Sequence, residues 1–195
     1  MNVYRFPIKL ESLLGGLPHK ADIIEDLYDY RKMSQTLTRY ASYLIGATMS
    51  TNDTKGFDLI KDGSKYIEAK KLSLKYGLDI ALSRDVGNGR KVTPENVQFS
   101  LDKNSFYIFY NISNHDEENL YCNIFEIPKE ILVEFGINAN KNKMTYNHFR
   151  EHVLRYCGDR TIYTFNENPF TSELNKVGVN FNPSSSDYSN IFCGR

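Results

Sequence analysis

The segment that decides the fold is Phe57-Asp58-Leu59-Ile60-Lys61-Asp62-Gly63-Ser64-Lys65-Tyr66-Ile67-Glu68-Ala69-Lys70-Lys71-Leu72. Two strand-like runs flank Asp62-Gly63, a dipeptide typical of the tight turn of a β-hairpin. Because successive side chains of a strand point to opposite faces, the second run places Glu68 and Lys70 together on one face. The turn brings Asp58 back beside them. We therefore expect two carboxylates and one ammonium group to converge on this hairpin.

This set of groups suits the hydrolysis of a phosphodiester. Carboxylate oxygens are ligands that the hard cation Mg²⁺ prefers, and the bound metal polarises a phosphate oxygen and acidifies a water molecule. A neighbouring ammonium group can orient or help deprotonate the attacking water and stabilise the negative charge that develops in the transition state. The hairpin therefore predicts a metal-dependent nuclease centre at Asp58, Glu68 and Lys70.

The motif of Asp58, a nine-residue gap and then Glu68-Ala69-Lys70 resembles the signature of the restriction-endonuclease-like PD-(D/E)xK nuclease superfamily. The resemblance implies an α/β fold with a mixed central β-sheet flanked by helices. It also implies that Asp58, Glu68 and the backbone carbonyl of Ala69 bind Mg²⁺, and that Lys70 is the catalytic lysine. The acidic residue that the family carries on its first helix has its nearest candidate in Glu25.

The family's order of elements would cover about residues 20–135: a helix, the catalytic hairpin, further strands, and a helix before a last strand. Upstream of the hairpin, apolar residues recur at helical spacing from Asp22 to about Met49, which predicts one long helix or two in sequence. Residues 3–10 alternate as a strand does, but Pro7 cannot donate to a ladder, so we expect at best an edge strand. Residues 51–56 read as a loop.

Downstream of the hairpin, residues 84–94 are expected to form a loop around Gly87-Asn88-Gly89, followed by three strand-like runs at 97–101, 106–112 and 121–127. A helix should run from near Pro128 to Gly136, and a second from about Thr145 to Cys157. The buried stripe of that second helix should be Tyr146, Phe149, Val153 and Tyr156. We expect one domain over 1–195, with residues 136–195 available for DNA recognition or dimerisation.

Composition limits the class of protein. Of the 195 residues, 41% are hydrophobic and 25% are charged, values typical of a globular chain. No stretch is apolar for long enough to be a signal peptide or a membrane span, so a cytoplasmic location is expected. Three widely spaced cysteines without a Cys-x-x-Cys pair predict free thiols. Because the formal net charge is zero, contacts to DNA must come from local groups of basic residues.

Two such groups are candidates, one after the catalytic strand and one on and before the helix near residue 150. The candidate DNA-binding residues are Lys71, Arg84, Arg90, Lys91, Lys141, Lys143, Asn147 and Arg150. The same helix carries His148-Phe149-Arg150-Glu151-His152, which matches the His-x-x-Glu-His pattern of inverted zinc peptidases. No third zinc ligand is evident downstream, and a polar helix face produces this pattern by chance, so we prefer the nuclease interpretation.

The sequence thus predicts a type II restriction endonuclease that hydrolyses a specific double-stranded DNA sequence with Mg²⁺ and leaves 5′-phosphate ends. One site per chain cuts one strand, so a homodimer is expected, and a cognate DNA methyltransferase is expected in the same system. Two alternatives stay open: a nuclease of the same fold that acts on DNA structure in repair or recombination, and a non-catalytic DNA-binding module. The sequence contains no phosphate-binding loop, serine-hydrolase elbow or dinucleotide fingerprint.

Overall fold

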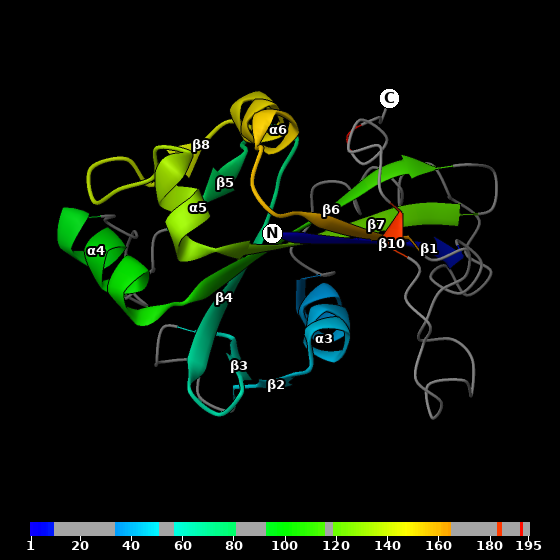
Figure 1. Cartoon of the computed structure of the whole chain (residues 1–195), viewed down its shortest axis with the longest axis horizontal. Coiled ribbons are helices and arrows are strands. Elements are labelled where there is room, and N and C mark those ends of the chain that lie inside the picture. Colours follow the sequence, from blue (N-terminus) through cyan, green and yellow to red (C-terminus); the bar gives the residue numbers. More distant parts are fainter. Residues whose placement is uncertain are drawn as a thin grey trace.

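A computed structural model describes residues 1–9, 34–50, 57–80, 93–115, 119–164, 183–184 and 192 of the chain (Figure 1). Its centre is a curled, mixed β-sheet. In spatial order the described strands are β10 (Pro183–Ser184), β9 (Thr161–Thr164), β1 (Asn2–Lys9), β7 (Asn119–Pro128), β6 (Phe106–His115), β4 (Lys65–Lys71), β3 (Leu59–Lys61) and β2 (Ala47–Met49). Neighbours run antiparallel except β4–β6 and β1–β9, which are parallel.

Helices flank both faces of this sheet. Helix α3 (Ser34–Ile45) lies on one face, and α4 (Pro94–Lys103), α5 (Lys129–Glu134) and α6 (Tyr146–Arg155) lie on the other (Figure 1). A two-stranded ladder of β5 (Leu78–Asp79) and β8 (Lys143–Met144) accompanies the second group. The expected α/β class, with a mixed central sheet between helices, is therefore confirmed.

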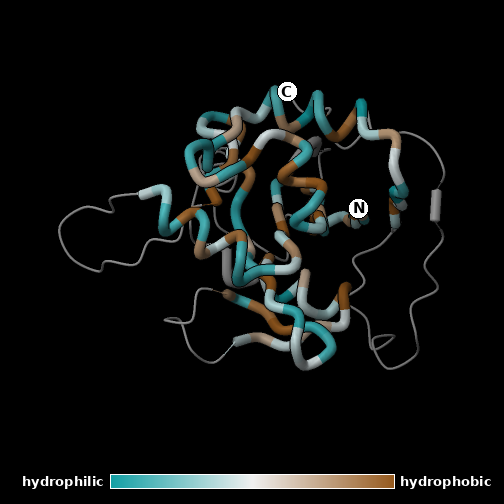
Figure 2. Tube along the Cα trace, turned by 60° about the vertical axis from the view of Figure 1, so that its left-hand side comes forward, coloured by the Kyte–Doolittle hydropathy of each residue, from teal (hydrophilic) through white to brown (hydrophobic). Residues whose placement is uncertain are grey.

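Alternation along the strands builds two hydrophobic cores, one on each face. On β6, Tyr107 and Phe109 belong to the core under α4, α5 and α6, whereas Ile108 and Tyr110 belong to the core under α3. Figure 2 colours the same trace by hydropathy, with hydrophobic residues in brown and hydrophilic residues in teal. Residues 107–112 of β6 are buried, and all of them except Asn111 belong to one of the two cores, because this part of the strand is covered on both faces.

The predicted hairpin is present. Strands β3 and β4 pair with Leu59 opposite Ile67 and Lys61 opposite Lys65. Asp62 and Gly63 both have positive φ angles, 53° and 71°, which is the backbone conformation that an Asp-Gly turn of this kind requires. This tight turn fixes the register, and the register determines which face of the sheet receives each side chain of β4.

The prediction of a strand at residues 97–101 was wrong, because this segment is the middle of α4. The helix begins with a cap: the Thr93 hydroxyl accepts from the amide of Asn96, and Pro94 occupies the first turn. Val97 and Leu101, one helical turn apart, are both buried. The helix connects β4 to β6, and such a crossover is what allows these two strands to run parallel.

The helix predicted for residues 22–49 is too long at its C-terminal end. Residues 22–33, and the loop predicted at 51–56, lie outside the described part of the chain. Helix α3 ends at Ile45, where Gly46 has a φ of 67° and stops the helix in the left-handed conformation. Ala47–Met49 then form β2, which pairs with β3.

The prediction that residues 3–10 form an edge strand was also wrong. Strand β1 pairs with β7 on one side and with β9 on the other, so it lies inside the sheet. Pairing with β9 ends at Arg5, two residues before Pro7, so the missing amide hydrogen of Pro7 does not interrupt it. The predicted alternation does hold, because Tyr4, Phe6 and Ile8 share one core.

Both predicted C-terminal helices are present, as α5 and α6. Gly136, with a φ of 92°, follows α5 as expected. On α6, Phe149 and Val153 are fully buried, while Tyr146 and Tyr156 pack against the same core with part of their surface exposed. Among the described residues, no helix has both the length and the apolar content that crossing a membrane would require.

Candidate active site on strand β4

Glu68 and Lys70 lie on the central part of β4, between β3 and β6. Their partners across the parallel ladder are Tyr107 and Phe109, so both side chains lie on the face covered by α4, α5 and α6. The Nζ atom of Lys70 is 2.5 Å from Oε1 of Glu68. Glu68 is almost completely buried, whereas a quarter of the Lys70 side chain is exposed. The pair therefore has a buried acidic end and a cationic end that solvent can reach.

Asp58 joins this pair from the hairpin. The ladder between β3 and β4 ends at Leu59 and Ile67, so the amide of Ala69 lies beyond the last strand pair. Oδ2 of Asp58 accepts a hydrogen bond of 2.7 Å from that amide, in the position that a continued strand would have filled. A charge-assisted bond of this kind holds a carboxylate firmly. Asp58 is thereby fixed beside the β4 backbone between Glu68 and Lys70.

The electrostatics of Glu68 reflect this crowding. Burial raises the pKa of the Glu68 carboxyl group, the positive charge of Lys70 opposes that rise, and the negative charge of Asp58 adds to it. A carboxyl group whose pKa is raised by burial and by a neighbouring carboxylate is typical of a functional site. A divalent cation between them would remove the repulsion.

The donor atoms present fit Mg²⁺. In a strand, the amide and carbonyl groups of one residue point to the same side, so the Ala69 carbonyl is directed toward the edge where Asp58 lies. Mg²⁺ is commonly held by one or two carboxylates and keeps several water molecules. Among the described residues, no group of three or more His, Cys, Asp and Glu side chains lies together, so these donors suit a hydrated magnesium ion rather than a closed protein cage.

The zinc pattern on α6 gains no support from the geometry. His148 and His152 lie one turn apart, but no third ligand of the usual kinds joins them in the described part of the chain. The His152 ring stacks instead on Phe135, with centroids 5.0 Å apart and planes 13° apart. Burial is the first cause that lowers the pKa of His152, followed by the positive charges of His148 and Lys141. The face of α6 is cationic, without an arrangement of metal ligands.

The predicted DNA-binding residues are dispersed. Arg84, Arg90 and Lys91 lie outside the described residues, as does Glu25. Lys71 pairs with Tyr110 in the ladder, so the strand directs it to the α3 face, opposite Glu68 and Lys70. The remaining candidates, Lys141, Lys143, Asn147 and Arg150, are exposed on and before α6.

Within that last group, the Lys143 charge is partly balanced. Its Nζ atom is 3.5 Å from Oδ2 of Asp79, and Asn142 donates to the other oxygen of the same carboxylate. Lys141 and Arg150 therefore remain the stronger candidates for contact with phosphate on this surface.

The sequence analysis missed a polar network that packs against Glu68. The hydroxyl groups of Ser100 on α4 and Tyr107 on β6 are 2.9 Å apart, and the Asn104 amide group donates to the Ser100 carbonyl at 3.0 Å. Burial raises the pKa of Tyr107 to about 12, and the Glu68 charge contributes to that rise. The spacing of residues 97, 100, 101 and 104 is helical, and it would have indicated that these residues share one buried face.

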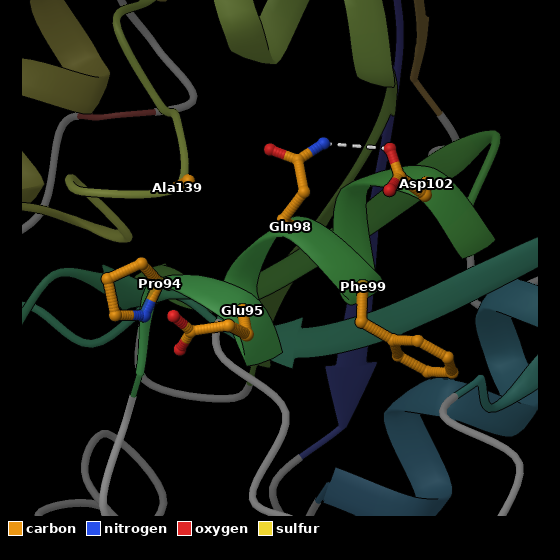
Figure 3. A pocket seen from close by; sticks show the side chains of 6 residues that line it. All are labelled: Pro94, Glu95, Gln98, Phe99, Asp102 and Ala139. Atoms are coloured by element: carbon orange, nitrogen blue, oxygen red, sulfur yellow. Dashed lines mark hydrogen bonds between the residues drawn. The ribbon is translucent and has the colours of Figure 1, made fainter.

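A shallow hollow of about 450 Å³ lies on the outer face of α4 (Figure 3). Its lining residues are Pro94, Glu95, Gln98, Phe99, Asp102 and Ala139. Within it, the Gln98 side chain donates to Oδ1 of Asp102 at 2.8 Å. None of the candidate active-site residues lines it, and its two carboxylates would repel a phosphate.

With this geometry established, the chain was compared with known proteins: no family model, no curated protein and no solved structure matches it.

Proposed function

We propose that this chain is a Mg²⁺-dependent deoxyribonuclease, and specifically a type II restriction endonuclease that cuts both strands of a short duplex sequence. The observation that carries the proposal is the arrangement at β4. Asp58 is fixed by the Ala69 amide, and the Glu68–Lys70 ion pair lies on the adjacent strand positions. Two carboxylates, one backbone carbonyl and one lysine are the groups that metal-assisted phosphodiester hydrolysis needs.

The order of elements supports the same proposal. Helix α3 is followed by the meander β2–β3–β4, then by α4, and then by β6 parallel to β4. This order contains a helix before the hairpin and a helix before a following strand, as the resemblance to the restriction-endonuclease-like superfamily implies, but α4 lies where the resemblance expects further strands.

In this mechanism, Asp58, Glu68 and the Ala69 carbonyl would hold Mg²⁺, which would supply a Lewis acid for the phosphate oxygen and for water. Burial and the Asp58 charge raise the pKa of Glu68, so Mg²⁺ would compete with protons for this carboxylate at low pH. Lys70 forms an ion pair with Glu68, and a quarter of the Lys70 side chain is exposed. The Lys70 ammonium group can therefore orient the attacking water and stabilise charge on the phosphate.

Cutting both strands requires two copies of this site, because each chain carries one. We therefore propose a homodimer, with two-fold symmetry that matches a palindromic duplex. A cognate methyltransferase in the same system would protect the host sites.

The proposal is tested by incubating the purified chain with unmethylated plasmid and phage DNA, in Mg²⁺ or in EDTA. The expected result is a set of discrete fragments that requires Mg²⁺ and disappears in Asp58→Asn and in Lys70→Ala. Glu95→Gln is the matched control, because Glu95 is an exposed acidic residue on the outer face of α4. It should leave cleavage unchanged.

Two other results would replace the proposal. Mg²⁺-dependent cleavage that follows DNA ends or branches, without discrete fragments, indicates a repair or recombination nuclease. Binding of duplex DNA without cleavage under any condition indicates a non-catalytic module.

A further inference from the structure

A second lysine, Lys103, approaches the candidate site from α4. The Nζ atom of Lys103 lies 4.3 Å from the centroid of the Tyr66 ring and 5.5 Å from that of Phe57. These two rings pack together, with centroids 4.3 Å apart and planes tilted by 32°. An ammonium group held at two aromatic faces is attracted by both ring quadrupoles, and it keeps a defined position.

The two rings belong to the site by their positions in the sequence. Phe57 immediately precedes Asp58. Tyr66 lies two residues before Glu68 on β4, so the two side chains lie on the same face, with Cα atoms about 7 Å apart. Along this face the order is Lys103 over Tyr66, then Glu68, then Lys70. Glu68 therefore lies between its ion-pair partner Lys70 and the Tyr66 ring that Lys103 covers.

Among the described residues, no carboxylate forms an ion pair with Lys103, and the contacts of its ammonium group there are those with the two rings. The neighbouring Asp102 accepts from Gln98 on the outer face of α4 (Figure 3). The outer face of α4 is therefore acidic, whereas Lys103, the basic residue of its last turn, lies at the hairpin. A cation fixed in this way is prepared to bind an anion.

A simpler role for Lys103 is structural. A lysine in the last turn stabilises a helix through the helix dipole, and its contact with the rings joins α4 to the hairpin. That role predicts a change in stability alone. It does not predict a change in the dependence of DNA binding on salt, so the two roles can be separated by measurement.

We propose that Lys103 is a phosphate-binding residue of this site, clamped by Phe57 and Tyr66 so that its ammonium group contacts the DNA phosphate next to the one hydrolysed. The inference rests on the proposed nuclease function, since it names a contact to the substrate of the same site. Lys103 positions DNA through charge, and Lys70 remains the lysine beside the metal-binding carboxylates.

The test is the binding of a short fluorescein-labelled duplex, followed by anisotropy in EDTA at several salt concentrations. Lys103→Gln should weaken binding about tenfold and reduce the slope of log K against log salt by about one, because one phosphate contact is lost. Lys103→Arg should bind like the unaltered chain. Lys75→Gln is the matched control: Lys75 also lies over a tyrosine, 5.2 Å from the centroid of Tyr76, but in an exposed turn. It should change binding less than twofold, about the effect expected of a rim charge.

Lys103→Met covers the case in which Lys103→Gln does not fold, because it keeps an apolar stem on the rings and removes only the charge. If Lys103→Gln and Lys103→Met bind with the affinity and salt slope of Lys75→Gln, the inference is wrong even when the unaltered chain cleaves DNA. If the unaltered chain does not cleave DNA with Mg²⁺, the nuclease proposal is wrong. The anisotropy measurement contains no Mg²⁺ and still decides the role of Lys103.

Discussion

The sharpest stability prediction concerns the ion pair between Lys61 and Glu126. Glu126 lies on β7 and is 2% exposed, and Lys61 is the last residue of β3. Nζ of Lys61 is 2.8 Å from Oε1 of Glu126. The other oxygen, Oε2, accepts from Asn2 at 2.8 Å and from the Tyr4 hydroxyl at 3.2 Å. This pair connects the β3–β4 hairpin to β7, beyond β4 and β6 in the sheet.

The perturbation is Lys61→Met, which removes the ion-pair partner of Glu126 and leaves this buried carboxylate two neutral donors and a Coulomb interaction with the Met1 amino group. Removing one partner of a buried ion pair costs about 3–5 kcal/mol, because the remaining charge is uncompensated. A quarter of the Lys61 side chain is exposed, so water already solvates part of it and the lower end, about 3 kcal/mol, applies. Adding Glu126→Gln removes the unpaired buried charge, and the amide oxygen of the new glutamine can still accept from Asn2 and Tyr4. The double variant should recover about 2 kcal/mol.

The assay is urea unfolding followed by far-ultraviolet circular dichroism, with an unchanged m value as the sign that the denatured state is unaffected. For a chain of this length, a loss of about 3 kcal/mol should lower Tm by about 6–12 °C. Lys65→Met is the matched control. Nζ of Lys65 is 2.8 Å from Oδ2 of Asp62, but about half of each side chain is exposed, so the loss should be much smaller than that of Lys61→Met.

Two results would refute this reasoning. If Lys61→Met costs no more than Lys65→Met, the burial of Glu126 does not make its partner necessary. If the double variant costs the sum of the two single variants, the two residues do not interact across the sheet.

Three further predictions follow from single positions. Gly77→Ala should lower the free energy of unfolding by several kcal/mol in urea titrations. Residue 77 has a φ of 71°, and a Cβ atom there would lie 1.9 Å from the Met144 carbonyl oxygen. A loss of about 1 kcal/mol or less would contradict this close approach. Phe149→Ala should cost about 3–5 kcal/mol by the same assay, because the ring is fully buried against Phe109 and Phe125; a smaller loss would mean that the core relaxes around it. The raised pKa of Glu68 contributes stability at low pH, and this stability is lost as the pH rises from 4.5, the ordinary pKa, through the pKa of the folded protein. At neutral pH and without Mg²⁺, the Glu68→Gln variant should therefore unfold at a higher urea concentration than the unaltered chain. Mg²⁺ at about a hundredfold excess over its dissociation constant should then stabilise the unaltered chain by about 2.7 kcal/mol and leave Glu68→Gln unchanged, and equal Mg²⁺ effects on both would contradict the assigned ligand.

Local rules were sufficient for the hairpin and for one face of β4. Asp62-Gly63 can occupy two positive φ angles, so the turn, and with it the register, follows from the sequence. Alternation then places Glu68 and Lys70 side by side. The same rule, applied one residue further, would have placed Lys71 on the opposite face and removed it from the surface around Glu68.

Residues 97–101 show why an apolar pattern alone is ambiguous. Val97, Phe99 and Leu101 alternate as in a strand, yet Val97 and Leu101 are also one helical turn apart. The N-terminal cap distinguishes the helix from the strand, because Thr93 followed by Pro94 is a start signal for a helix. Giving this signal more weight than the alternation would have predicted α4 correctly.

Contacts between distant segments were beyond prediction from one sequence. Nothing near Pro7 indicates that its strand pairs with residues 119–126 on one side and 161–164 on the other. The hydrogen bond from the Ala69 amide to Asp58 depends on where the β3–β4 ladder ends. The contact of Lys103 with Tyr66 depends on the packing of α4 against the hairpin. Each of these features is set by tertiary packing, which sequence periodicity does not encode.

The interior position of β1 has a consequence for the time course of folding. The meander β2–β3–β4, helix α4 and β6 are close in sequence, whereas the residues that pair with β1 lie at least 110 residues later. The Met1 amino group likewise donates to the carbonyl of Asp159. Contacts at such separation form slowly, because a long loop must close first. At a synthesis rate of about 5–20 residues per second, roughly ten to thirty seconds pass before the last of these partner strands has been made. During translation, β1 therefore stays an unpaired apolar segment that can associate with chaperones or with other nascent chains.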